Sequence, residues 1–245
     1  LQKMMSNRDD TPMMVLCRLL LWGALLAKVA SSGEVTSNVL VAGFDGVGAV
    51  TAMALDTTCA ALEATRGRVC FAAWTLEASH SGAAEVQRSL ERGQLQRVGM
   101  AGIVMLGEGP LALELTGTNV LANSSSLPVE NGGPAIAPPT LDLARIVDWP
   151  FSRDAGASYG NEGLYRTARA IRRLGVARPT DDALLLPFAF ASLPANASVA
   201  DLALKVTDLA KAMLGGGGGD QGHVFATHQE TSVSPPKDDH RFAAK

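Results

Sequence analysis

Two residues that can do chemistry stand close together in the segment Trp74-Thr-Leu-Glu-Ala-Ser-His-Ser-Gly82. Glu77 and His80 directly follow an apolar run, and α/β sheets place their sites at the carboxyl ends of parallel strands. A carboxylate and an imidazole at such a point indicate a metal site or an acid/base pair. One Glu and one His are too few for zinc, which takes three or four ligands. A surface loop with a solvated glutamate is therefore an equally good interpretation.

A second candidate is the glycine-rich segment Gly43-Phe-Asp-Gly-Val-Gly48, where an apolar run passes into a helical pattern. Backbone N–H groups at such a turn can hold a diphosphate, and glycine lets the ligand approach. The spacing is G-x-x-G-x-G, whereas dinucleotide sites use G-x-G-x-x-G. The segment therefore favours a tight strand-to-helix turn, and a dinucleotide-binding oxidoreductase is kept as an alternative.

The elements that must position these residues alternate along the chain. Short apolar runs predict strands, and helical periodicity predicts helices between them. The predicted strands are residues 39–42, 68–74, 102–106 and 111–115, and the predicted helices are 49–64, 82–92, 140–146, 163–174 and one beginning at 199. Residues 119–139 are rich in Ser, Gly, Asn and Pro and predict a long loop. Alternating strands and helices predict an α/β fold, a mostly parallel twisted sheet with helices on both faces.

Composition excludes some classes of function. With 245 residues, 47% of them hydrophobic, the chain is long enough for one domain with a substantial core. A formal net charge of -3 and scattered basic residues argue against a nucleic acid as partner. The three cysteines have no metal-like spacing, and an odd number does not make a disulfide framework. We expect Cys59, on a helix, and Cys70, on a strand, to be small buried hydrophobic residues.

The two ends of the chain and two sequence triplets bear on the compartment. Residues 1–34 form an apolar segment, of which 13–30 is either a signal peptide or a core helix. Asn123-Ser-Ser and Asn196-Ala-Ser are N-glycosylation acceptors in polar stretches. Together they predict the secretory pathway.

Residues 217–245 are of low complexity and predict a disordered tail, where three histidines are expected to be solvated: His223, His228 and His240.

The order of these parts resembles the zinc-dependent aminopeptidase superfamily over residues 35–216. That family has His-x-Asp after its first strand, and here Gly43 stands for the His while Asp45 is kept. The family's Glu-Glu pair is matched by Leu76 and Glu77, and Glu108 lies near the place of its next acid. The segments Val69 to Gly82, Val104-Met-Leu-Gly-Glu-Gly109, Pro138-Pro-Thr-Leu141 and Thr207-Asp-Leu-Ala-Lys-Ala212 are similar to the degenerate nicastrin branch.

This resemblance implies a non-catalytic luminal domain of a γ-secretase-type complex, which recognises or gates substrates and stabilises the complex. It implies no catalytic residue, no metal and no cofactor. It also implies binding to a presenilin-type protease, to the other membrane subunits and to substrate amino termini, on the luminal side of the ER, Golgi or plasma membrane. Glu77 would bind the substrate, although strict counting places Leu76 at the family position. The alternatives are the oxidoreductase and an active zinc aminopeptidase with four ligands: Asp45, Glu77, His80 and Glu108.

Overall fold

The structure is a computed structural model that describes most of the central part of the chain. The described residues are 36–62, 67–124, 126–146, 148–179 and 181–215. The segment 13–30, expected to be a signal peptide or a core helix, lies outside the described residues. The tail at 217–245 lies outside them as well. The domain boundaries drawn from the sequence therefore stay predictions.

A seven-stranded sheet forms the centre of the described part, with the order β2-β3-β1-β4-β11-β5-β8. The four central strands β3, β1, β4 and β11 are parallel, while β2 and β5 run antiparallel to their inner neighbours. At one edge β8 pairs parallel to β5. The strands are β1 (Thr36–Phe44), β2 (Cys59–Leu62), β3 (Gly67–Leu76), β4 (Met100–Glu108), β5 (Ala112–Glu114), β8 (Phe151–Ser152) and β11 (Phe188–Leu193).

The central strands are apolar on both faces. In β1 the residues from Val39 to Ala42 are fully buried, as expected for a parallel strand that is covered on both sides. The register pairs Phe44 of β1 with Leu76 of β3, and Gly43 with Leu106 of β4. The carboxyl ends of these strands therefore lie together at one edge of the sheet.

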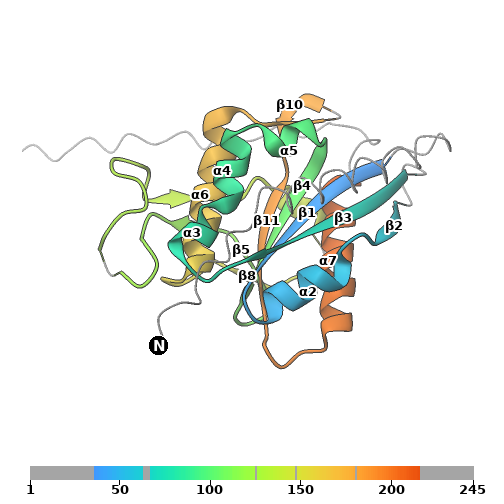
Figure 1. Ribbon diagram of the computed structural model, residues 1–245, viewed down its shortest axis with the longest axis horizontal. Helices are drawn as coiled ribbons and strands as arrows, with labels where there is room; N and C mark the ends of the chain where they lie inside the picture. The colour runs from blue at the N-terminus through green and yellow to red at the C-terminus, as the bar shows by residue number, and fades with distance from the viewer. Residues whose placement is uncertain (1–35, 63–66, 125, 147, 180, 216–245) are drawn as a thin grey trace, which may run out of the picture.

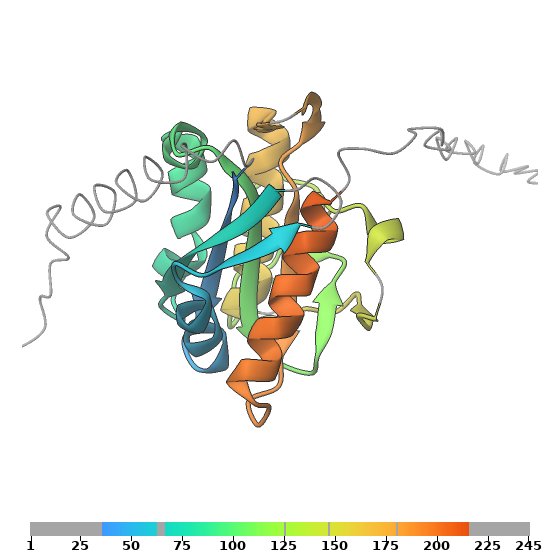
Figure 2. The same ribbon diagram turned by 90° about the vertical axis from the view of Figure 1, so that its right-hand side faces the viewer.

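Helices cover both faces of the sheet (Figure 1). On one face α2 (Val47–Leu55) and α7 (Val199–Leu214) enclose one hydrophobic cluster, and α7 stands in front of the sheet in Figure 2. On the other face the helices are α3 (His80–Ala83), α4 (Glu85–Glu91), α5 (Gln94–Arg97) and α6 (Tyr159–Leu174), which enclose a second cluster. The predicted fold, an α/β sheet that is mostly parallel with helices on both faces, is confirmed.

Smaller elements lie around the sheet. Two small antiparallel sheets pair β6 (Gly117–Thr118) with β7 (Ile136–Ala137), and β9 (Ala177–Arg178) with β10 (Asp181–Leu185). A single 3-10 turn, η1 (Leu143–Arg145), stands where the sequence predicts a helix over 140–146. Among the described residues no helix is both long enough and apolar enough to span a membrane.

The predicted helix over 49–64 is wrong in its second half. Helix α2 ends at Leu55, and a turn with Thr57 at φ 60° leads into the edge strand β2. Asp56 Oδ1 accepts a hydrogen bond from Ala73 N–H, which holds this turn against β3. Because β2 pairs directly with β3, Cys59 lies opposite Cys70 and the two form a disulfide. The expectation of two unpaired buried cysteines is therefore also wrong.

The sequence interpretation also missed a central strand. β11 lies between β4 and β5, and all six of its residues are buried. Helix α6 begins at Tyr159, four residues before the predicted start at 163. Ser158 caps its first turn by accepting a hydrogen bond from Asn161 N–H, and Gly175 ends it with φ 58°. The additional first turn matters because it carries Glu162.

Candidate functional site

The glycine-rich turn after β1 is explained by packing. A Cβ on Gly43 would lie 2.0 Å from the carbonyl oxygen of Gly48, and a Cβ on Gly48 would lie 2.8 Å from the carbonyl oxygen of Leu106. Gly46 has φ +85° and forms the N-cap position of α2. These glycines let the strand, the turn and the helix approach one another closely. Their presence therefore needs no bound dinucleotide.

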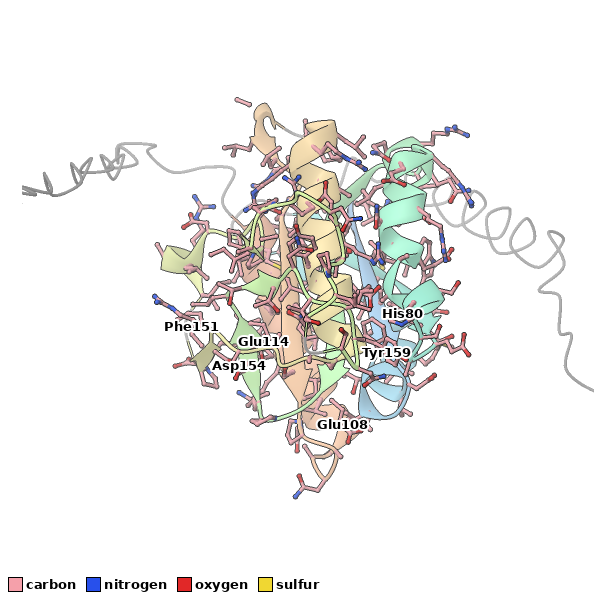
Figure 3. All side chains as sticks on the ribbon, turned by 90° about the vertical axis from the view of Figure 1, so that its left-hand side faces the viewer. His80, Glu108, Glu114, Phe151, Asp154 and Tyr159 are labelled. Atoms are coloured by element: carbon pink, nitrogen blue, oxygen red, sulfur yellow. A yellow bond between two sulfur atoms is a disulfide. The ribbon has the colours of Figure 1, made fainter. Side chains whose placement is uncertain are left out.

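His80, which the sequence suggested as a reactive residue together with Glu77, pairs with a residue that is distant in the sequence. His80 Nδ1 lies 2.7 Å from Glu162 Oε2, and 82 positions separate the two residues. His80 begins α3, directly after Ser79, whose hydroxyl accepts a hydrogen bond from Gly82 N–H. Glu162 lies in the first turn of α6. The imidazole ring also meets the ring of Tyr159 edge to face, with 5.3 Å between the centroids. The two residues are labelled near each other in Figure 3.

Glu162 is fully buried, and each of its oxygens has a partner. Oε2 accepts Ala122 N–H at 3.1 Å as well as His80, and Oε1 binds the guanidinium of Arg166. Burial alone would raise the pKa of Glu162, but the hydrogen bonds from His80, Ala122 N–H and Arg166 outweigh it and lower this pKa below 4.5. Glu162 is therefore a carboxylate at neutral pH.

This pairing determines which nitrogen of His80 can react. The His80 side chain is 55% exposed, whereas that of Glu162 is 0% exposed. A carboxylate on Nδ1 fixes the orientation and tautomer of an imidazole, so that Nε2 becomes the nitrogen that accepts or donates a proton. The described residues thus contain an oriented acid/base group at the amino end of α6.

A second buried carboxylate lies on the same face of the sheet. Glu114, in β5, accepts a hydrogen bond from the hydroxyl of Ser192, in β11, at 2.7 Å between Oγ and Oε1. Both residues are almost fully buried, and Glu114 Oε2 has no hydrogen-bond partner among the described residues. Close by in the same layer, the ring of Phe190 fills the space next to Gly160, where an added Cβ would lie 2.7 Å from Cζ.

The residues expected from the sequence are not brought together as one group. Asp45 Oδ2 accepts a hydrogen bond from Ala78 N–H at 2.9 Å, and Glu77 Oε2 accepts one from the hydroxyl of Ser79. Glu108 lies over the turn at Gly46, where a Cβ would be 2.9 Å from Oε2. No three His, Cys, Asp or Glu side chains of the described part of the chain converge as a metal site would require.

The chemical partner of His80 could have been found only in part from the sequence. Glu77 was the candidate, because it is three positions away, but its carboxylate binds Ser79 instead. Glu162 was missed because it lies in a turn that the sequence interpretation left outside the helix. The one available signal was Ser158, a typical N-cap residue four positions before Glu162.

Comparisons with known proteins show a shared fold. No protein-family model and no curated protein matches the chain. Pyroglutamyl peptidase I from Bacillus amyloliquefaciens is similar in structure, with TM-score 0.57 and 16% identity over 74% of this chain and 96% of that one. Pyrrolidone carboxyl peptidase from Thermococcus litoralis gives 0.57 and 16%, over 73% and 93%. A mutant of the Pyrococcus furiosus enzyme gives 0.54 and 17%, over 72% and 98%.

These similarities correct the interpretation drawn from the family resemblance. The resemblance to nicastrin and to zinc aminopeptidases is wrong, because the solved structures that match are pyroglutamyl peptidases. The expected γ-secretase function and the presenilin-type and other membrane partners are therefore wrong as well. The alternatives of a zinc aminopeptidase and an oxidoreductase are likewise unsupported.

The expectation that the chain is not an enzyme is contradicted by the same matches, since the structural neighbours are peptidases. At 16–17% identity the similarity establishes the fold alone. The chain thus has the α/β fold of the pyroglutamyl peptidases, with the His80–Glu162 pair at the amino end of α6.

Proposed function

We propose that this chain is a peptidase that hydrolyses the amide bond after a small amino-terminal group of a peptide. The observation that carries the proposal is the 2.7 Å pair between His80 Nδ1 and the buried carboxylate of Glu162. An imidazole that a carboxylate orients through Nδ1 can act as a general acid/base group through Nε2. The shared fold of the pyroglutamyl peptidases supports the reaction class and suggests a pyroglutamyl group as the first substrate to test.

We assign the part of the nucleophile to water. The cysteines among the described residues are Cys59 and Cys70, which are joined in a disulfide, so neither offers a thiol. In the proposed reaction His80 Nε2 removes a proton from a water molecule, whose oxygen attacks the carbonyl carbon. The same imidazolium then gives this proton to the leaving nitrogen as the C–N bond breaks. Glu162 stays ionised and stabilises the imidazolium.

In the proposed reaction, the amino end of helix α6 stabilises the negative charge that forms on the substrate carbonyl oxygen. Its first N–H groups, including those of Tyr159 and Gly160, have no acceptor within the helix, and the helix dipole makes this end partially positive. Because the ring of His80 packs on Tyr159, the first residue of α6, the reacting carbonyl oxygen would lie near this positive end. Negative charge that develops on that oxygen is stabilised there.

Hydrolysis of fluorogenic amides tests the proposal. Pyroglutamyl, alanyl and leucyl amides of a coumarin amine are compared with purified protein, first as wild type and then as His80→Gln. We expect the variant to keep its fold and to lose about 100-fold to 10,000-fold in kcat, as for removal of a general base. Lys211→Gln, on α7 at the opposite face of the sheet, is the control and keeps wild-type activity. Equal rates for wild type and His80→Gln on every substrate would rule out the proposal.

Glu77 is proposed as a substrate-binding residue of this peptidase. Its carboxylate is exposed and accepts a hydrogen bond from the hydroxyl of Ser79, the residue directly before His80. An exposed carboxylate there favours substrates with a free α-ammonium group. We expect Glu77→Gln to raise KM for alanyl and leucyl amides and to leave KM for the uncharged pyroglutamyl amide unchanged. An equal change for all three substrates would argue against this role.

The proposed compartment is the secretory pathway. The Cys59–Cys70 disulfide supports it, because structural disulfides persist in oxidising compartments. The two acceptor residues Asn123 and Asn196 are exposed, and Asn123 Nδ2 donates a hydrogen bond to the hydroxyl of Tyr159. Expression in a eukaryotic secretory host, followed by removal of N-glycans, should lower the apparent mass. Asn123→Gln and Asn196→Gln should each remove one step of that change. An unchanged mass would contradict the assignment.

A further inference from the structure

A pocket of about 120 Å³ lies beside α6, and one of its lining residues, Arg166, binds Glu162. Its basic side chains are Arg166, Arg169 and Arg173, which stand three and four positions apart and so share one face of the helix. Gln87 of α4, Glu130 of the loop before β7 and Tyr165 of α6 are the other polar residues of the lining. Three guanidinium groups and one carboxylate make the charge of the lining positive.

Each of these arginines already has an acidic partner, but the partners differ in exposure. Arg169 forms two hydrogen bonds to Glu130, of 3.1 and 3.3 Å, and both side chains are partly exposed. Arg173 pairs with Glu91 near the surface. Such exposed pairs stabilise a protein by little, because water competes for both partners. A ligand with more negative charge than one carboxylate can therefore compete for the guanidinium groups.

Arg166 connects the pocket to the catalytic pair. Its Nε and Nη2 bind Glu162 Oε1, while Nη1 makes a bond of only 3.4 Å to Gln87. The Nη1 donor is thus the weakly engaged one. An acceptor in the pocket would bind this donor and leave the bond to Glu162 in place.

We propose that this pocket binds a small dianion of the phosphate class, held by Arg166, Arg169 and Arg173. Guanidinium groups are suited to phosphate because their planar array of N–H donors matches its oxygens. A pocket of about 120 Å³ is large enough to admit a tetrahedral anion. Free phosphate and a phosphomonoester share this chemistry. The inference does not depend on the proposed peptidase activity.

Thermal unfolding with inorganic phosphate tests the site, with sodium chloride at matched ionic strength as the reference. We expect phosphate to raise the unfolding midpoint saturably, because a ligand that binds only the folded state stabilises it. O-phosphoserine is the second probe. If it binds as well as inorganic phosphate, the natural ligand is a phosphomonoester, and if only phosphate binds, it is the free ion. A midpoint that is the same in phosphate, phosphoserine and chloride would overturn the proposal.

Two substitutions of the exposed pair should act in opposite directions. Arg169→Gln removes charge-assisted bonds and should weaken phosphate binding about tenfold or more. Glu130→Gln releases Arg169 and should strengthen binding. The matched controls are Arg145→Gln and Asp142→Asn, which alter an ion pair of similar exposure outside the pocket. If both pocket variants weakened binding, the residues would act through packing, and the proposal would be wrong.

A second readout follows the link through Arg166. Phosphate should move the ring-proton resonances of His80 in a titration followed by nuclear magnetic resonance. His80→Gln identifies those resonances, and Arg169→Gln should weaken the response in parallel with binding. Saturable binding with unmoved His80 resonances would contradict the part assigned to Arg166.

Discussion

Two buried carboxylates lie on the same face of the sheet, and they differ in how many partners they have. Glu162 binds Arg166, Ala122 N–H and His80, so both of its oxygens are used. Glu114 binds only the hydroxyl of Ser192, and its Oε2 has no partner among the described residues. Glu162 binds a half-exposed imidazole, whereas the one described partner of Glu114, Ser192, is itself buried.

This difference separates a group suited to chemistry from one that costs stability. A buried charge is tolerated when hydrogen bonds replace the water that it loses, and it is costly when they do not. The partners of Glu162 keep it ionised and let it orient His80. The described hydrogen bond of Glu114 comes from one hydroxyl, that of Ser192. Glu114 is buried like Glu162, but among its described bonds it orients no imidazole that could react. The predictions below follow from that contrast.

The largest effect is expected for Glu162→Leu. This change leaves Arg166 and Ala122 N–H without their buried acceptor, and loss of one partner from a buried ion pair destabilises a protein by about 3–5 kcal/mol. Urea unfolding measures the loss. Glu130→Leu breaks a more exposed pair and is the control, with an expected cost of about 1 kcal/mol or less. Similar costs for the two variants would show that Glu162 is not the better-connected acid.

The next effect is expected for Ser192→Ala. Without this hydroxyl, Glu114 loses its one described donor, and an unsatisfied buried polar group costs about 1–3 kcal/mol. Unfolding in urea at neutral pH provides the measurement. Ser152→Ala removes a hydroxyl whose bonds are exposed, and its stability should stay within about 0.5 kcal/mol of wild type. A neutral result for Ser192→Ala would mean that Glu114 has another donor.

A smaller change in stability is expected when each of the two glutamates is replaced by glutamine, and the two replacements should differ. Glu114→Gln replaces a buried carboxyl group whose Oε2 has no described partner, so stability should change by less than about 1 kcal/mol or rise. Glu162→Gln removes a charge that three donors stabilise and should be clearly destabilising. Parallel urea curves for the two variants make the comparison, which fails if Glu114→Gln is the more harmful change.

The smallest effect concerns acid stability. The pKa of Glu162 in the folded chain lies below its ordinary value of 4.5. The folded state thus holds fewer protons than the unfolded state in this range. The stability from this shift is complete above pH 4.5 and is lost as the pH falls through the lower folded pKa. Unfolding at pH steps from 6 to 3 should show a weaker fall for Glu162→Gln than for wild type. Parallel profiles would contradict the assignment.

Patterns that are local in the chain were predicted well. The apolar run at 39–42 became the buried centre of β1, and the three- and four-residue spacing after Ser198 became α7. Alternation of such segments was enough to predict the parallel sheet and its two helical layers. The resemblance to another family was wrong in spite of this success, because many α/β folds share the same order of strands and helices.

Pairings between distant segments were not predicted. The Cys59–Cys70 disulfide depends on β2 turning back along β3, although its residues had helical character in the sequence. β11 went unrecognised as well, although it holds the middle of the sheet and carries Ser192.

The sequence by itself determined the layered α/β architecture, because burial of apolar stretches depends on residue type and spacing along the chain. It also placed His80 at the carboxyl end of a buried strand. Only the tertiary structure decided that the partner of His80 is Glu162 and not Glu77. The physical reason is that an ion pair needs two groups within about 4 Å, and their distance depends on how α6 packs beside α3 and not on their separation in sequence.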